Sequence, residues 1–230
     1  MRKNALTNIG HPPRSIWSKI FIKEGRLRPT LRIIAYGPIY FLTMLVVNSL
    51  LHWFVFNSLP LSDWLLQVLK IARNIACVLL ATYLARRFLD KRTLGSLGLS
   101  HYRGWLADIA VGIGLGVLLN LLGFLVQWGS GWLTINGFAW QSLSVGGLVG
   151  ALALECFLFV MVGFNEELIF RGYIMQNLAE DWSMVVAVFV TSALFGLAHL
   201  LNPYASLIST LSITVGGIFA ACGYLVTGSL

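Results

Sequence analysis

The chain has 230 residues, of which 57% are hydrophobic and 11% are charged, and its mean hydropathy is +0.80. Because a soluble domain carries about a quarter charged residues, this composition excludes an ordinary water-soluble globule. The other solvent for so much apolar surface is a lipid bilayer, which a helix of about 20 apolar residues crosses. The three cysteines lie in apolar runs without the spacing of a zinc site, which indicates small core residues.

The net charge of +7 is concentrated before the first long apolar run. Within residues 1–32, only Glu24 opposes the basic residues, which are Arg2, Lys3, Arg14, Lys19, Lys23, Arg26, Arg28 and Arg32. Basic residues beside a membrane span usually set its orientation and contact anionic lipid headgroups, so we expect no nucleic-acid partner. Residues 1–32 are predicted to form a basic segment at the membrane surface, with an amphipathic helix over 15–24.

Six apolar runs are long enough to form helices that cross a membrane. They cover residues 34–57, 64–88, 105–127, 145–180, 184–201 and 204–226. The sequence therefore predicts an all-α, polytopic transmembrane helical bundle, with one membrane-embedded domain over 33–230.

The connections between these runs differ in charge. The connection 89–104 follows Arg86 and Arg87 and is basic, whereas the connection 128–144 carries no charge and contains three tryptophans. Because cytoplasmic connections are enriched in Lys and Arg, the first is expected inside and the second outside. We therefore expect an integral protein of the cytoplasmic (inner) membrane with both termini inside.

Some runs contain residues that need a partner or a special packing. Lys70 and Arg73 lie in the second run and either extend to the membrane surface or face the bundle interior. The third run has a small-residue face, formed by Gly112, Gly114, Gly116 and Gly123. Such a face allows two helices to approach closely, and we expect it to pack inside the bundle rather than to form a dimer.

Most ionisable residues of the membrane interior lie between positions 155 and 199, and such residues are functional candidates because they are costly in a bilayer. Glu167 and Arg171 are spaced i, i+4 and share one helix face. Glu166 points about 100° away from Glu167 and is free for another partner. Glu155, eleven residues before Glu166, falls near the same face.

Glu166 and His199 are almost equally far from the turn near Ser183, at seventeen and sixteen residues. In an antiparallel helix pair, both therefore lie at one depth, about 25 Å of helix from the turn. A carboxylate and an imidazole at one depth could share a water that the carboxylate activates, or could contribute two ligands to a metal such as zinc. The alternative is structural: an ion pair of Glu167 with Arg171 and an interhelical hydrogen bond from His199.

The motif Glu-Glu-x-x-x-Arg, followed by Phe-x-x-x-His on the next helix, resembles the first two motifs of the CAAX prenyl-protease and bacteriocin-processing family, the CPBP or Abi membrane endopeptidases. The resemblance covers residues 145–230. It implies that Glu166 and His199 hold and activate the attacking water and that Glu167 and Arg171 support the catalytic site. It also implies a membrane-associated or prenylated peptide substrate and, since members are described as metalloproteases, Glu166 and His199 as candidate ligands of a divalent metal.

The family pattern continues with another helix that carries a second His and an Asn or Asp. No His follows His199, so the resemblance implies a C-terminally truncated enzyme that is weak or inactive without that helix. Two other functions are compatible with the residues. One is a non-catalytic scaffold, immunity or partner-binding protein that keeps the fold. The other is a transporter in which Glu and His relay protons, although the internal repeat typical of transporters is absent from the sequence.

Overall fold

The computed structural model describes residues 21–53, 62–99 and 102–230, and almost all of its regular structure is helical. A short hairpin precedes the helices, in which β1 (Ile22–Lys23) pairs antiparallel with β2 (Arg26–Leu27). The all-α fold class predicted from the sequence is confirmed.

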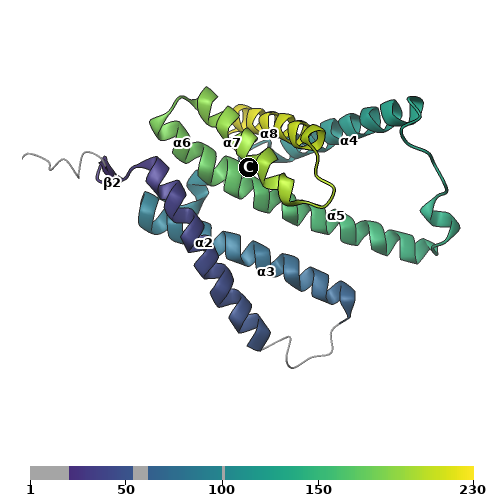
Figure 1. The fold of residues 1–230 in the computed structure, drawn as a ribbon, viewed down its shortest axis with the longest axis horizontal. Helices are drawn as coiled ribbons and strands as arrows, with labels where there is room; N and C mark the ends of the chain where they lie inside the picture. The colour runs from purple at the N-terminus through teal and green to yellow at the C-terminus, as the bar shows by residue number, and fades with distance from the viewer. Residues whose placement is uncertain (1–20, 54–61, 100–101) are drawn as a thin grey trace, which may run out of the picture.

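The helices run back and forth along the bundle (Figure 1). In chain order, the elements are α2 (Pro29–Leu51), α3 (Asp63–Leu84), η2 (Ala85–Asp90), η3 (Leu94–Leu97), α4 (Trp105–Gly129), η4 (Ala139–Gln141), α5 (Val145–Glu167), η5 (Leu168–Met175), α6 (Gln176–Asp181), α7 (Met184–Ala198), η6 (His199–Leu201) and α8 (Leu207–Thr227). Within the described residues, six helical stretches are long and apolar enough to cross a membrane, as predicted.

One long helical stretch, Val145–Asp181, forms the middle of the bundle and comprises α5, η5 and α6. The pair α7 and α8 packs on one side of it, and the pair α2 and α3 packs on the other (Figure 1). The long stretch therefore connects the two helix pairs, and every predicted site residue but one lies on it.

Serine side chains begin three of the membrane helices. The hydroxyl groups of Ser144 and Ser183 accept hydrogen bonds from the backbone N–H of Gly147 and Val186. Ser206 begins α8 in a reciprocal arrangement with Ser209. These caps satisfy N–H groups that a helix leaves unpaired at its first turn, where lipid offers no acceptor.

The helices α7 and α8 cross closely because each carries a glycine at the contact. A Cβ atom on Gly196 would lie 2.8 Å from the carbonyl oxygen of Thr210 and would collide with the Thr214 hydroxyl. A Cβ atom on Gly217 would lie 3.1 Å from the Cβ of Ser192. Small residues permit this approach, which in a bilayer replaces the hydrophobic effect as a source of packing energy.

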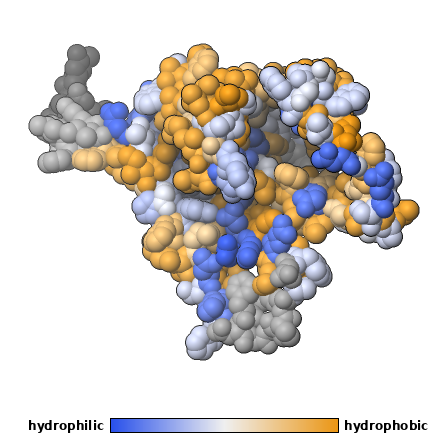
Figure 2. Space-filling view, turned by 45° about the vertical axis from the view of Figure 1, so that its right-hand side comes forward, coloured by the Kyte–Doolittle hydropathy of each residue, from blue (hydrophilic) through white to orange (hydrophobic). Residues whose placement is uncertain are grey.

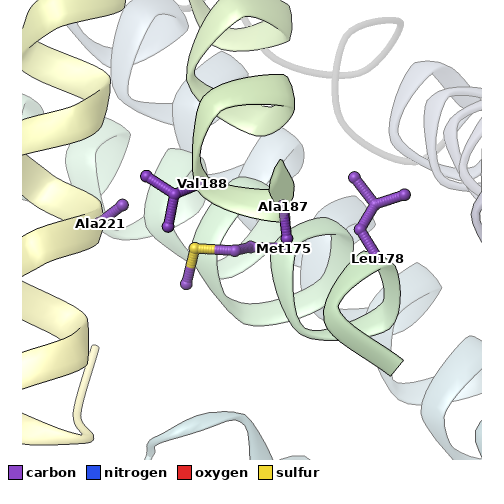
Figure 3. Packing of buried hydrophobic residues seen from close by; sticks show 5 residues of the cluster. All are labelled: Met175, Leu178, Ala187, Val188 and Ala221. Atoms are coloured by element: carbon purple, nitrogen blue, oxygen red, sulfur yellow. The ribbon is translucent and has the colours of Figure 1, made fainter. Parts of the chain in front are cut away.

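A small apolar core joins the long helix to the α7 and α8 pair. Figure 3 shows its five buried residues, which are Met175, Leu178, Ala187, Val188 and Ala221. The flexible Met175 side chain fills the space between α7 and α8, where Val188 and Ala221 approach each other. This core fixes the position of α7 relative to the long helix.

The face of the molecule seen in Figure 2 is apolar over much of its described area. Large side chains such as Val145, Phe159 and Val215 are exposed along the spans. An exposed apolar surface of this extent matches contact with lipid rather than with water.

The structure corrects the expected amphipathic helix over 15–24. Residues 15–20 lie outside the described residues, and Ile22–Lys23 form a strand instead. Glu24 and Gly25 both have positive φ, at 52° and 73°, and make the tight turn of the hairpin. The first membrane helix then begins at Pro29, five residues before the predicted boundary at 34, because proline suits the first turn of a helix.

The third membrane helix, α4, differs from the prediction in its packing. None of its residues is buried. No other heavy atom lies within 4 Å of a Cβ built on Gly112, Gly114, Gly116 or Gly123. The prediction that this small-residue face packs inside the bundle is therefore wrong for the described residues, and the close glycine contact occurs between α7 and α8 instead.

The two basic residues of the second span separate in the structure. Lys70 is exposed, whereas Arg73 donates a hydrogen bond of 2.9 Å from Nη1 to Oδ1 of Asn48 on α2. Arg73 thus takes the interior alternative and links α2 to α3.

Candidate active site

Glu166 and His199 face each other across the interface between the long helix and α7. The distance from Glu166 Oε1 to His199 Nε2 is 3.5 Å. Glu166 is the penultimate residue of α5, and His199 is the first residue of η6, directly after α7. The approach predicted from their equal distance to the turn at Ser183 is confirmed.

The backbone of the long helix changes its winding next to this pair. The α-helix ends at Glu167, and the following eight residues, Leu168–Met175, form a π-helix. Such wide turns are rare and occur mostly at functional sites, because they alter the direction in which side chains project. Arg171 lies within the π-helix, so the change in winding falls inside the Glu-Glu-x-x-x-Arg motif.

Arg171 is the buried centre of the site, with a side chain that is 2% exposed. Its Nη1 lies 3.0 Å from Oε1 of Glu167, and its Nη2 donates a hydrogen bond of 2.9 Å to the carbonyl oxygen of Gly217. Its guanidinium carbon lies 4.5 Å from the centre of the Phe195 ring. Arg171 thus holds together the long helix, α7 and α8.

Phe195 connects Arg171 to His199. Its ring lies 4.7 Å from the imidazole in an edge-to-face arrangement and 5.0 Å from the ring of Phe170. Its carbonyl oxygen lies 2.8 Å from Nδ1 of His199. Because a carbonyl oxygen only accepts hydrogen bonds, Nδ1 carries a hydrogen, and in the neutral ring Nε2 is then an acceptor.

The four predicted site residues differ in how far their side chains are exposed. Arg171 is buried, whereas the side chains of Glu166 and His199 are 33% and 20% exposed. Glu167 is half-buried beside Arg171. The reactive pair is therefore partly accessible from outside the bundle, whereas the Arg171 guanidinium is not.

A metal centre needs more donors than this pair supplies. Catalytic zinc sites usually have three protein ligands, and Glu166 with His199 provides two. Glu167 is engaged by Arg171, and no group of three His, Cys, Asp or Glu residues that could hold a metal occurs in the part of the chain that the structure describes. The described residues therefore do not complete the zinc site that the resemblance implies.

Glu155 does not join the site. It is exposed on α5, about 16 Å of helix from Glu166. It also forms no hydrogen bond or ion pair with any residue in the described ranges. Both residues lie in the continuous helix α5, but depth separates the two carboxylates.

A second group of buried polar residues was not predicted from the sequence. We call it the ion-pair cluster, and it consists of Arg32, Arg86, Asp90, Asn177 and Glu180. Asp90 accepts from Arg32 at 3.2 Å and from Arg86 at 2.7 Å, and all three side chains are at most 1% exposed. Arg32 also contacts Glu180 at 2.7 Å and Asn177 at 2.8 Å.

The ion-pair cluster joins α2, η2 and α6 at the end of the bundle opposite the α7–α8 connection. The sequence places Arg32 among basic residues that share Glu24 as their one nearby acid, which favours a surface position. Arg32 pairs with Asp90 and Glu180, which are 58 and 148 residues away in the sequence. No local sequence pattern therefore indicates these pairs. The available signal was the presence of Asp90 and Glu180 at the ends of two apolar runs, where a charge needs a partner.

Comparison with known families supports the motif assignment. Residues 148–230 match the family model Rce1-like, described as Type II CAAX prenyl endopeptidase Rce1-like. This range contains Glu166, Glu167, Arg171 and His199. No curated protein and no solved structure matches the chain. The resemblance inferred from the two motifs is thus confirmed over residues 148–230, which match the Rce1-like, or CPBP, family model.

Proposed function

We propose that this protein is an intramembrane endopeptidase that hydrolyses a peptide bond in a membrane-associated or lipidated peptide. The observation that carries the proposal is the 3.5 Å separation of Glu166 Oε1 and His199 Nε2. Both atoms belong to side chains that are partly exposed on the bundle, so a substrate that approaches through the bilayer can reach them.

The hydrogen-bonding state of His199 indicates which kind of group can lie between its Nε2 atom and Oε1 of Glu166. With its Nδ1 hydrogen directed at the Phe195 carbonyl, a neutral His199 presents a lone pair at Nε2. An ionised Glu166 also presents lone pairs, and two acceptors repel unless a hydrogen donor lies between them. A water molecule can donate one hydrogen to each acceptor and keep its own lone pairs free for attack.

The proposed reaction uses this water as the nucleophile. Its oxygen bonds to the carbonyl carbon of the substrate while Glu166 takes its proton, which gives a tetrahedral oxyanion. The oxyanion then collapses, the C–N bond breaks, and the proton on Glu166 passes to the leaving amine. Water adds OH to the acid product and H to the amine product, so the atoms balance without a metal or cofactor.

Arg171 and Glu167 support this chemistry from behind the reactive pair. Two neighbouring carboxylates repel each other, and the Arg171 guanidinium relieves this repulsion by pairing with Glu167. Glu166 is thereby left with His199 as its partner and remains available as the base. The contact of Arg171 with Phe195 also fixes the ring whose carbonyl orients the imidazole.

The substrate class follows from the family description and the membrane setting together. The matching family is described as prenyl endopeptidases, and here the pair lies in helices that are long and apolar enough to span a bilayer. We therefore infer that the substrate of this chain carries a lipid chain or a short apolar segment, which holds the scissile bond at the depth of Glu166.

The test is cleavage of a fluorogenic prenylated peptide in proteoliposomes, measured for the 230-residue chain and for the same chain extended by a helix with the second His and the Asn of the family pattern. Glu166→Gln and His199→Asn should each lower kcat at least about 100-fold, a typical contribution of a positioned acid or base. Glu155→Gln is the matched control, because it removes another intramembrane carboxylate from the same helix and should leave the rate unchanged. Full activity of Glu166→Gln would refute the mechanism. Equal losses in all three variants would assign the effect to folding.

A further inference from the structure

A cavity of about 300 Å³ lies at the end of the second membrane span, away from the catalytic pair. Its lining residues are Tyr83, Arg87, Lys91, Arg92, Thr93 and Leu94. Half of them are basic, and Tyr83 and Thr93 add hydroxyl groups. A lining with several charged and neutral donors favours an anionic ligand with several oxygen atoms.

The protein leaves most of this positive charge without a counter-charge. Arg92 is paired with Glu180 at 2.6 Å. Lys91 donates to the carbonyl oxygen of Gly25, which carries no net charge. Arg87 forms no ion pair with an acid among the described residues. The cavity therefore has two basic side chains whose charge only a ligand or solvent can balance.

The acid that lies nearest to Arg87 and Lys91 in the sequence does not compensate their charge. Asp90 lies between Arg87 and Lys91 in the sequence, but its side chain is fully buried and occupied by Arg32 and Arg86. The carboxyl end of a helix adds about half a negative charge, which is smaller than the charge of the two side chains. The cavity remains positive on balance.

The position of the cavity at the end of a membrane span favours a lipid over a soluble anion as its ligand. The span Trp64–Asp90 ends beside it, so the cavity lies where the membrane core gives way to the headgroup layer. Phe88, next to Arg87, is 68% exposed, and half-buried Leu94 lines the cavity. A phosphate with acyl chains satisfies both surfaces, because its charge meets the cations while its chains lie along the apolar side chains.

We propose that this cavity binds the phosphate headgroup of an anionic phospholipid, held by Arg87 and Lys91 and assisted by Tyr83 and Arg92. The site adjoins the ion-pair cluster through the contact of Arg92 with Glu180. Headgroup binding would thus stabilise the end of the bundle at which α2, η2 and α6 meet. The proposal is independent of catalysis and does not involve Glu166 or His199.

The experiment measures lipid binding by the full, detergent-purified chain with native mass spectrometry. The probes are phosphatidylglycerol, phosphatidylcholine, and glycerol 3-phosphate at matched concentrations. The test variant is Arg87→Gln with Lys91→Gln. Its matched control is Lys70→Gln with Arg103→Gln, which also removes two exposed basic residues but leaves the cavity intact. Circular dichroism checks that both variants keep their helix content.

We expect the wild-type chain and the control variant to bind phosphatidylglycerol at least about tenfold more tightly than phosphatidylcholine, and the cavity variant to lose this preference. Arg87→Lys, which keeps the charge, should retain most of it. Equal binding by the cavity variant and the wild type would overturn the proposal, as would equal losses in both double variants. Displacement of the lipid by glycerol 3-phosphate at the same concentration would show that the site takes a soluble phosphate, which also overturns it.

Discussion

Phe195 contacts Arg171 through its ring face and His199 through both its ring and its carbonyl oxygen. One residue therefore connects the buried cation of the first motif to the imidazole of the second. The proposed water-activating pair depends on the position of this ring, although Phe195 itself carries no reactive group.

Replacement of Phe195 by leucine should lower activity while the carbonyl contact to His199 remains possible. The cation–π contact is worth about 1 kcal/mol, and its loss allows Arg171 and the imidazole more freedom. We expect a decrease in kcat of about tenfold with little change in KM, measured with the peptide assay. Phe157→Leu, on the exposed face of α5, is the control. A Phe195→Leu enzyme with wild-type kcat would show that the ring does not position the site.

Removal of Arg171 should destabilise the fold, because it leaves the Glu167 carboxylate without its partner. The loss for a fully buried pair is about 3–5 kcal/mol, but Glu167 is 32% exposed, so we expect about 1–3 kcal/mol for Arg171→Met. The double variant Arg171→Met with Glu167→Gln should recover part of this loss. Thermal unfolding in detergent measures both changes, and a double variant less stable than the single one would contradict the pairing.

Replacement of Gly196 by alanine should separate α7 from α8. The added Cβ would meet the Thr214 hydroxyl and the backbone of Thr210, and overpacking of this kind costs about 1–3 kcal/mol. Gly116→Ala on α4 is the matched control, because no heavy atom lies within 4 Å of the added Cβ there. Unfolding midpoints that fall equally in both variants would show that helix propensity, rather than the contact, sets the effect.

Replacement of Asp90 by asparagine should be among the most damaging single changes outside the site. Arg32 and Arg86 would keep their buried charge but lose the carboxylate that both contact, a loss of about 3–5 kcal/mol. Glu24→Gln is the control, since its carboxylate is exposed and contacts Arg26 at the surface. A fully folded Asp90→Asn protein at wild-type yield would disprove a structural role of the ion-pair cluster.

The orientation of the chain remains a prediction from its charges. The basic residues of 21–32 and 86–92 meet at one end of the bundle, where Arg26 donates to the carbonyl oxygen of Asp90. By the positive-inside rule we expect this end to face the cytoplasm. Labelling of single cysteines with an impermeant reagent should therefore modify position 135 from outside and leave position 95 protected. The reverse pattern would refute the topology.

The sequence was sufficient for features that depend on local spacing. Membrane spans follow from length and apolarity, and the approach of Glu166 to His199 follows from helix geometry and one turn at Ser183. The family motifs then named Arg171 and Phe195 as neighbours of that pair. These predictions succeeded because a helix converts sequence distance into depth with little freedom.

Other features depend on tertiary contacts that no local pattern records. The glycines of α4 and those of α7 and α8 look alike in the sequence, yet only Gly196 and Gly217 face a neighbouring helix at close range. The burial of Arg32 required Asp90 and Glu180 from distant segments. The π-helix at Leu168–Met175 has no sequence signature that we recognise, since its aliphatic and aromatic residues resemble those of the α-helical spans.

The contacts of Arg32 can form only in a fixed order while the protein is synthesised. Its first carboxylate partner, Asp90, is 58 residues away, and its second, Glu180, is 148 residues away. At about 5–20 residues per second, a ribosome needs roughly 7–30 s to reach the second partner. During that interval the first helix holds a cation that is only partly compensated near the membrane. The contact between Arg32 and Glu180, which joins the first helix to α6, can therefore form only after α6 has been synthesised.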